Sequence, residues 1–339
     1  MAFDPARVRR DYGDPWGEAR SCRQHAALFD FSFIACAAVS GPRAAEAVQT
    51  LTGRPIASVR PGRIGYAVRE GGGRLVSDLT VWCHSETHYW VMTGREQDVL
   101  DLARTLLPGA QCHDLSAGHS IFALQGPKSL AILAPLVSNL PETLAHLSYY
   151  GHAQATVAGC KCRVGRLGYT GEPGFEIVVA NACADALWSA LAARARPAGF
   201  AAADILRIEA GLVLFANEFR VPVRAEEIGL ARFAGREPAS SSDLALCCFR
   251  AGTRDRPVLW QPAQSDLQRP TEPGTLIATS ACHSELAGGA LGLGFARRPD
   301  LASGRDLHDP SGTFTHIEPV ALPFYEAARA RMRAPWQGA

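Results

Sequence analysis

The sequence predicts an α+β protein of two similarly built lobes followed by a smaller β domain. Three observations support this fold class. The order strand, helix opening at a Gly-Pro pair, strands, glycine-rich turn, strands and helix occurs twice before residue 196. A chain of 339 residues also exceeds what one hydrophobic core usually fills. Beyond residue 243, short β-prone stretches alternate with Pro, Gly, Asp and Ser, as in a small barrel or sandwich.

The first lobe begins with a predicted helix over residues 21–28 and a strand over residues 31–39. The next helix opens at Gly41-Pro42, where proline is favourable because its missing N–H would have no helical partner. Its apolar stripe comprises Ala44, Ala45, Ala47, Val48 and Leu51. The remaining predicted elements are strands over residues 63–68, 74–83 and 88–93 and a helix over residues 97–107.

The second lobe repeats this order. A strand is predicted over residues 119–123, and the helix that opens at Gln125-Gly126-Pro127 runs to about residue 136. Its other elements are strands over residues 149–157, 162–168 and 177–179 and a helix over residues 182–195. Residues 235–243 are a linker by composition, which predicts one domain over residues 1–238 and another over residues 239–335. The basic tail, residues 325–333, is predicted to be helical.

Composition narrows the class of protein. Apolar residues make up 47% and charged residues 20%, as in a soluble globular protein. A net charge of +1 gives no field that would attract nucleic acid or a membrane surface. The first twenty residues are polar and no run approaches the roughly 20 apolar residues that cross a bilayer, so we expect a cytoplasmic protein. The ten cysteines show no four-ligand zinc spacing, which predicts buried reduced thiols and no metal.

The segment from Gly168 to Glu176, Gly-Tyr-Thr-Gly-Glu-Pro-Gly-Phe-Glu, carries the strongest chemical signal. Its glycines permit a sharp turn or the close approach of a ligand. A carboxylate placed where strand pairing resumes can accept two parallel hydrogen bonds from a flat heterocycle. On physical grounds alone, a hairpin turn whose acids face water explains the pattern equally well.

An ordered set of blocks resembles the glycine-cleavage T-protein (aminomethyltransferase) family. The blocks begin at Leu28, Val39, Pro61, Gly72, Ala123, Gly168, Asp204 and Ala278, and the set extends from about residue 20 to the C-terminus. The resemblance implies three domains, two α+β lobes and a C-terminal β-barrel, around a central folate channel. It further implies tetrahydrofolate as cofactor and places the folate site in the domain over residues 1–238.

Asp78 is the predicted catalytic residue. An aspartate inside the apolar run of residues 75–82 is costly if it is buried without a partner, so it either faces solvent or belongs to a site. The resemblance places the family's motif aspartate here, beside the reacting folate nitrogens, where a carboxylate stabilises developing positive charge. The family usually has two adjacent acids, whereas this chain has Ser77 before Asp78.

Four further residues are predicted to bind the cofactor. Glu176 matches the acid that accepts hydrogen bonds from the pterin, and Tyr66 and Tyr169 match aromatic positions that pack against folate. Either tyrosine could instead be an ordinary core residue. Arg207 matches the arginine of the family's Leu-Arg-x-Glu-Ala-Gly block, where it pairs with folate carboxylates or forms a structural ion pair with Glu209 or Asp204.

Several family positions differ. Phe33 stands where the family often has histidine, Leu230 stands where tryptophan is common, and Asn217-Glu218 lacks the usual preceding residues. Thr93-Gly94 resembles instead the folate domains of dimethylglycine- and sarcosine-oxidising enzymes. Together these departures put a lipoyl carrier protein in doubt as partner, although the folate pocket is retained.

We therefore predict an enzyme that transfers a methyl or aminomethyl unit between a small-molecule donor and tetrahydrofolate, in either direction. The sequence does not name the donor. Two alternatives stay open at this point: a folate-binding module without turnover, and a folate-domain subunit of a larger oxidase complex. The signature of the family's iron–sulfur branch is missing, because residues 211–218 contain no cysteine.

Overall fold

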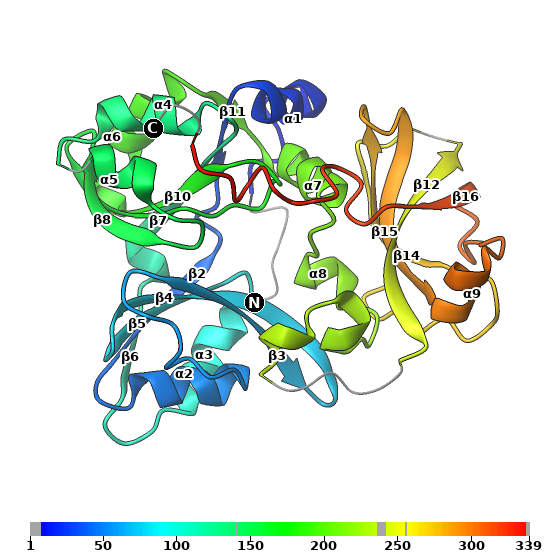
Figure 1. The fold of residues 1–339 in the computed structure, drawn as a ribbon, viewed down its shortest axis with the longest axis horizontal. Helices are drawn as coiled ribbons and strands as arrows, with labels where there is room; N and C mark the ends of the chain where they lie inside the picture. Colours follow the sequence, from blue (N-terminus) through cyan, green and yellow to red (C-terminus); the bar gives the residue numbers. More distant parts are fainter. Residues whose placement is uncertain (1–7, 140, 236–241, 255, 337–339) are drawn as a thin grey trace. The chain divides into compact units, whose positions relative to one another are not determined.

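The computed structural model describes residues 8–139, 141–235, 242–254 and 256–336 (Figure 1). The chain divides into two compact units. The first unit comprises the described residues up to Ala67, Asp78–Ala203 and the residues from Ala330 onward; the second comprises Val68–Ser77 and Asp204–Arg329. The predicted boundary between residues 238 and 239 lies outside the described residues, as does most of the predicted linker.

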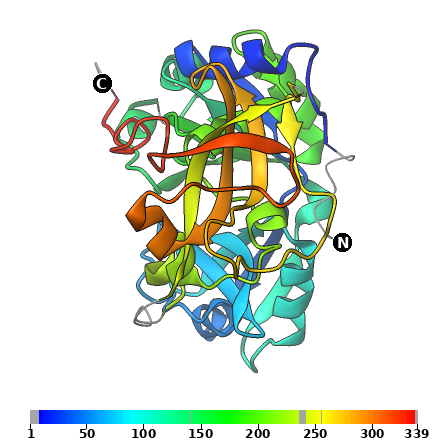
Figure 2. The same cartoon turned by 90° about the vertical axis from the view of Figure 1, so that its right-hand side faces the viewer.

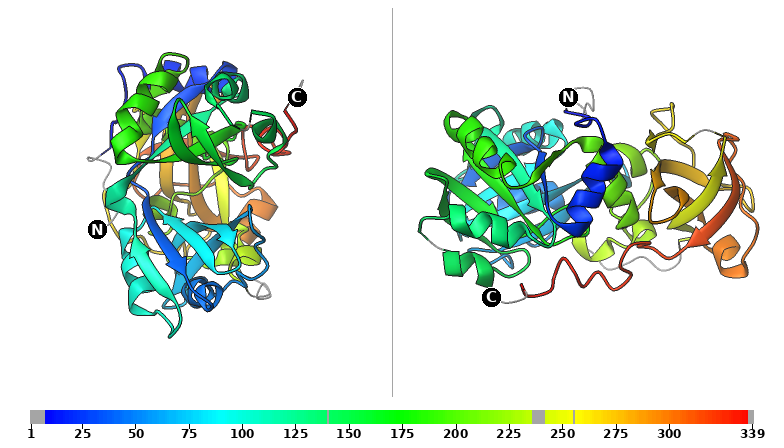
Figure 3. Two further views of the ribbon diagram at one scale, coloured as in Figure 1. Left: turned by 90° about the vertical axis from the view of Figure 1, so that its left-hand side faces the viewer. Right: turned by 90° about the horizontal axis from the view of Figure 1, so that it is seen from above.

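The first unit contains two sheets; in the left panel of Figure 3 one is mostly green, with its strand over residues 27–30 in blue, and the other is blue to cyan. The six-stranded sheet has the order β11-β1-β7-β10-β9-β8 and is antiparallel except where β1 pairs with β11. Its strands are β1 (Ala27–Asp30), β7 (His119–Gln125), β8 (His152–Val157), β9 (Cys160–Gly165), β10 (Gly174–Ala180) and β11 (Arg196–Ala198). Its helices are α1 (Pro15–Gln24), α4 (Ser129–Leu133), α5 (Pro141–His146) and α6 (Ala184–Ala192).

The five-stranded sheet has the order β3-β4-β5-β2-β6 and belongs to the first unit, except for residues 68–77 at the ends of β3 and β4, which belong to the second. Its strands are β2 (Ala35–Ser40), β3 (Ile64–Gly71), β4 (Arg74–Ser85), β5 (His88–Thr93) and β6 (Gln111–Asp114). Two helices, α2 (Ala44–Thr52) and α3 (Glu96–Arg104), belong to this half of the unit. Alternation along β4 sends Leu79, Val81 and Cys83 into the core that these helices cover, and therefore turns Asp78 and Trp82 to the opposite face.

The other faces of the two sheets meet inside the first unit. The ring of Trp82 lies 5.3 Å from that of His152, centroid to centroid, and His84 lies 5.1 Å from His152. A Cβ atom at Gly165 would overlap the Trp82 ring, so glycine on β9 is what lets the sheets approach. Because Glu176 is the cross-strand neighbour of Gly165, its side chain emerges on this inner face.

The second unit contains a five-stranded sheet of order β13-β14-β15-β12-β16, which Figure 2 shows face on in yellow to red. Its strands are β12 (Leu244–Thr253), β13 (Leu259–Trp260), β14 (Ile277–Ser284), β15 (Gly289–Arg297) and β16 (Phe314–Val320). Its helices are α8 (Phe215–Glu218) and α9 (Arg298–Ser303), and α7 (Phe200–Glu209) runs into it from the first unit. Short 3₁₀ turns complete the structure at Ser116–Gly118, Ala134–Leu136, Asn181–Cys183, Ala225–Ile228 and Ala231–Phe233.

The predicted helix over residues 21–28 and strand over residues 31–39 are displaced, because residues 27–30 form β1 and β2 begins at residue 35. Two of the differences from the sequence predictions have an evident physical cause. The first helix begins at Pro15 rather than residue 21, because the Asp14 side chain caps it by accepting from the Gly17 N–H. The predicted tail helix over residues 325–333 is a series of turns, with φ of 53° at Glu326 and 49° at Arg329. All ten cysteines are free thiols, as predicted, and eight of them are buried.

Candidate functional site

The glycine-rich segment packs around one side chain, Gln125, at the end of β7. A Cβ atom at Gly168 or Gly174 would overlap the Gln125 amide. The Gln125 Nε2 donates to the carbonyl oxygens of Leu167 (3.1 Å) and Phe175 (3.3 Å). Its Oε1 accepts from Thr170 Oγ1 at 3.2 Å. These two glycines therefore make room for a buried amide of the protein, and the segment is held rigidly on the strand that precedes it.

The two acids of the segment have different surroundings. Glu172 is 1% exposed and pairs with Arg23 (3.2 Å) and with Arg331 of the C-terminal segment (3.1 Å). Glu176 is 8% exposed and its carboxyl has no hydrogen-bond or ion-pair partner among the described residues. Burial raises the pKa of the Glu176 carboxyl to about 7. Glu176 is thus a buried acid whose hydrogen-bonding capacity the described protein leaves unused.

Asp78 lies on β4 beside Tyr66 on β3. The Tyr66 hydroxyl donates to Asp78 Oδ2 at 3.0 Å. Burial, followed by the negative charge of Asp78, raises the pKa of the Tyr66 hydroxyl well above its usual value. Tyr66 therefore keeps its proton and holds one oxygen of the Asp78 carboxylate in place. Because the two oxygens belong to one planar group, this contact also restricts the second oxygen.

Two more tyrosines belong to the same neighbourhood. Tyr169 contributes to the raised pKa of Tyr66, which places it within electrostatic range. Tyr150, which sequence reasoning missed, also contributes to that shift. Burial raises the pKa of Tyr150 itself, with Tyr149, Glu176 and Asp78 adding to the effect. A hydrogen bond between Tyr66 and Asp78 and these electrostatic influences link five residues, called here the carboxyl–tyrosine cluster: Tyr66, Asp78, Tyr150, Tyr169 and Glu176.

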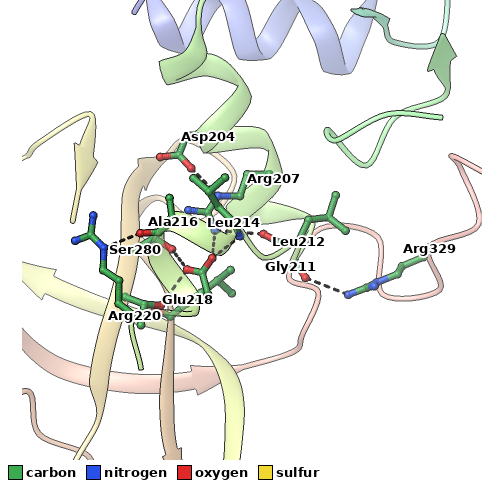
Figure 4. Close-up of polar contacts among 12 residues, drawn as sticks. Asp204, Arg207, Gly211, Leu212, Leu214, Ala216, Glu218, Arg220, Ser280 and Arg329 are labelled. Carbon is green, nitrogen blue, oxygen red and sulfur yellow. Dashed lines mark hydrogen bonds and ion pairs between the residues drawn. The ribbon is translucent and has the colours of Figure 1, made fainter. Parts of the chain in front are cut away.

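Arg207, the remaining predicted site residue, lies in the second unit in a network of its own (Figure 4). Its side chain is 0% exposed; Nε donates to Asp204 Oδ1 (2.6 Å) and Nη1 donates to Glu218 Oε2 (2.8 Å). The other oxygen of Glu218 accepts from Thr279 Oγ1 and Ser280 Oγ. This matches the structural ion pair with Asp204 that the sequence left open. The predicted contact between Arg207 and folate stays a prediction.

The carboxyl–tyrosine cluster has a definite chemical character. Its carboxyls accept hydrogen bonds, its hydroxyls donate them, and its rings offer flat apolar faces. A planar heterocycle that carries both N–H donors and a carbonyl acceptor fits these groups, and the unpartnered Glu176 carboxyl is the group that a ligand would satisfy. The fold is that of an α+β protein, and this cluster offers groups that complement such a heterocycle. In the described ranges, no group of three His, Cys, Asp or Glu side chains could hold a metal ion.

Comparison with known proteins identifies the family. Residues 13–237 match the family model described as GCVT N-terminal domain. The chain is 32% identical to the aminomethyltransferase of Streptomyces coelicolor over 93% of its own length and 90% of that protein. It is 30% identical to the aminomethyltransferase of Saccharopolyspora erythraea, over 91% of this chain and 89% of that one.

A solved structure has the same fold. The glycine cleavage system aminomethyltransferase T from Bartonella henselae superposes with a TM-score of 0.72, at 24% identity, over 94% of this chain and 91% of that one. The chain belongs to the glycine-cleavage T-protein (aminomethyltransferase) family. It is a tetrahydrofolate-dependent one-carbon transferase, as predicted. In the described part of the chain, no helix is long and apolar enough to cross a membrane.

Proposed function

We propose that the chain transfers an aminomethyl-borne one-carbon unit between a small-molecule donor and tetrahydrofolate at the carboxyl–tyrosine cluster. One observation carries this proposal: Glu176 is a buried acid with no partner among the described residues and a pKa raised to about 7. Such a group costs stability unless a ligand uses it. The pterin of tetrahydrofolate presents adjacent N–H donors, which are the complement of a carboxylate.

The residues of the cluster have different proposed roles. Glu176 accepts from the pterin N–H groups and fixes the ring. Asp78, steadied by the Tyr66 hydroxyl at 3.0 Å, faces the reacting centre and stabilises positive charge that develops there. Tyr169 supplies an aromatic surface. Tetrahydrofolate, when bound, supplies the nitrogens that accept the one-carbon unit.

The proposal also covers the finer architecture. The antiparallel pairing of β12 with β15 and of β14 with β15 in the second unit supports the predicted C-terminal β-barrel, which stays a proposal. The domain boundary between residues 238 and 239 and a location in the cytoplasm remain predictions. So does a contact between Arg207 and the folate carboxylates.

The class of donor is inferred from the relatives of this chain and not from any single residue of the site. Because the curated relatives are named aminomethyltransferases, we take an aminomethyl donor as the substrate class. The sequence departures at Phe33 and Leu230 leave the lipoyl carrier protein in doubt as the partner that delivers it. The turnover experiment therefore presents the aminomethyl group in two ways: on a small-molecule thiol and on a lipoylated carrier protein.

Binding is tested first. Saturating tetrahydrofolate is expected to raise the melting temperature of the wild type, and Glu176→Ala is expected to abolish that rise while the protein stays folded. A wild-type melting curve that does not respond to tetrahydrofolate would contradict the proposed site.

Turnover is tested separately. The wild type is incubated with tetrahydrofolate and a panel of aminomethyl and N-, O- and S-methyl donors, and the folate product is identified by mass. Asp78→Asn is expected to bind tetrahydrofolate and to turn over more slowly, with kcat/KM reduced about 100-fold. Tetrahydrofolate binding without any product across the panel would support the folate-binding module or the oxidase subunit instead.

A further inference from the structure

Tyr150 adopts a backbone conformation that its sequence does not favour. Its φ is 61°, in the left-handed region that bulky residues rarely occupy. Two backbone hydrogen bonds impose it: the Tyr150 N–H donates to the Arg166 carbonyl, and the Ile64 N–H donates to the Tyr150 carbonyl, both at 2.8 Å. Strained residues persist where surrounding structure over-determines them, and they gather at functional sites. The fold thus holds Tyr150 in place from Ile64, at the start of β3, and from Arg166, the residue after β9.

The hydroxyl of Tyr150 differs from those of Tyr66 and Tyr149 in its hydrogen bonding. Tyr66 donates its proton to Asp78 Oδ2, and Tyr149 donates to Met332 Sδ at 3.3 Å. The Tyr150 ring is half-buried and packs edge-on against Tyr149, with centroids 4.8 Å apart. Within the described residues its hydroxyl has no hydrogen-bond partner. The Tyr150 hydroxyl is therefore a donor that the described protein leaves available to a ligand.

The charges around Tyr150 fix the role of that hydroxyl. Burial raises its pKa, and the carboxylates of Glu176 and Asp78 raise it further, while Arg333 acts in the opposite direction. The hydroxyl therefore keeps its proton throughout the physiological range and acts as a donor. The backbone contacts place Tyr150 beside both groups that the proposed function assigns to the pterin. Arg166, which bonds to the Tyr150 N–H, directly follows Gly165, the cross-strand partner of Glu176. Ile64, which bonds to the Tyr150 carbonyl, lies two positions before Tyr66, which holds Asp78.

The chemistry of the pterin edge indicates what this donor meets. Along that edge the 2-amino group and N3–H come first, the 4-oxo group next and N5 last. Glu176 complements the two N–H donors, and Asp78 is assigned to the reacting nitrogens. We propose that the Tyr150 hydroxyl donates a hydrogen bond to the 4-oxo group of tetrahydrofolate and so distinguishes it from 4-amino analogues. This inference rests on the proposed function of the same site.

The experiment compares two ligands on three proteins. The ligands are tetrahydrofolate and its 4-amino-4-deoxy analogue, in which an amino group replaces the carbonyl acceptor and N3 carries no hydrogen. The proteins are the wild type, Tyr150→Phe and Tyr149→Phe. Because the lost N3–H affects all three proteins alike, only the difference between proteins for each ligand reports on Tyr150. Dissociation constants are measured by calorimetry, and melting curves without ligand check the fold. Tyr150→Phe keeps the ring and is expected to bind tetrahydrofolate about fivefold more weakly, with the analogue changed less than about twofold. Tyr149→Phe, the matched control, is expected to leave both constants unchanged.

Each other outcome contradicts the inference in a recognisable way. Equal affinity of the wild type and Tyr150→Phe for tetrahydrofolate would show that the hydroxyl makes no such bond. An equal loss for both ligands would show that Tyr150 only shapes the pocket. If the wild type bound neither ligand, the proposed function would be wrong, and this inference would fall with it for that separate reason.

Discussion

Replacing Glu176 by glutamine tests the central physical claim about the site. Glutamine keeps the shape of the side chain but cannot ionise. In the wild type, burial raises the pKa of Glu176 from 4.5 to about 7. Below about pH 4 the carboxyl is protonated in the folded and unfolded chain alike, so ionisation has no effect on stability there.

The effect of pH follows from the direction of this shift. Between 4.5 and about 7 the unfolded chain releases its proton while folded Glu176 keeps it, so the free energy of unfolding falls as pH rises. At 1.36 kcal/mol for each pKa unit, the difference between the folded and unfolded pKa of Glu176 lowers the free energy of unfolding of the wild type by about 3 kcal/mol above pH 7. The glutamine variant does not have this penalty. Its stability relative to the wild type should therefore rise by about 3 kcal/mol between pH 4 and pH 8.

Urea unfolding of both proteins across this pH range measures the difference, and any constant cost of burying the amide cancels from it. Glu172→Gln is the matched control, because the carboxylate of Glu172 is also buried but is paired with Arg23 and Arg331. Removing that charge should destabilise the protein at pH 8 rather than stabilise it. Parallel stability curves for wild type and Glu176→Gln would show that Glu176 ionises normally in the folded protein, and the argument for a ligand at this carboxyl would fail.

Three other substitutions test separate parts of the account. Asp78→Asn should reduce kcat/KM about 100-fold while the dissociation constant of tetrahydrofolate changes little, since its charge acts on the developing transition state; equal losses in binding and turnover would assign Asp78 to binding alone. Gly168→Ala should lower the free energy of unfolding in urea by about 2 kcal/mol, because the added methyl overlaps the Gln125 amide. Adding Gln125→Ala to the same chain should recover part of this loss. If it recovers nothing, the strain lies elsewhere. Arg207→Met should cost about 3–5 kcal/mol of stability, because it leaves the Glu218 carboxylate buried without its cation; a stable variant with weakened folate binding would instead support the predicted contact with folate.

Much of the fold was predictable because it is encoded locally. The alternation along residues 74–83 predicts β4, and the Gly-Pro start with its apolar stripe predicts α2. The elements that were missed or misplaced depend on distant partners. The three-residue strand β11 exists through its pairing with β1, and α1 depends on the Asp14 cap, which lies ahead of any apolar periodicity. The tail lacks the predicted helix because two of its residues have positive φ.

For the candidate site, the sequence supplied the residue types and the structure supplied their partners. Asp78 and Tyr66 were predicted individually, and the hydrogen bond between them arises from strand pairing that brings β3 beside β4. Gln125 is a further case: as part of a Gly-Pro helix start it signalled a helix, yet its amide organises the glycine-rich segment more than 40 positions later, at Leu167 and Phe175. No local pattern contains that information.

The sequence by itself determined the family, the cofactor and the two acids of the Gly168–Glu176 segment. Ordered motifs and the spacing of residue types are properties of the sequence alone. The resemblance already matched Glu176, and not Glu172, to the acid that binds the pterin; only the tertiary structure shows what surrounds each acid. Glu172 is neutralised by Arg23, 149 positions away, and by Arg331 in the C-terminal segment, whereas Glu176 emerges between two sheets with no such partner among the described residues. The physical reason is that the ionisation and hydrogen bonding of a buried group depend on what surrounds it in space, and in this protein those surroundings come from remote parts of the chain.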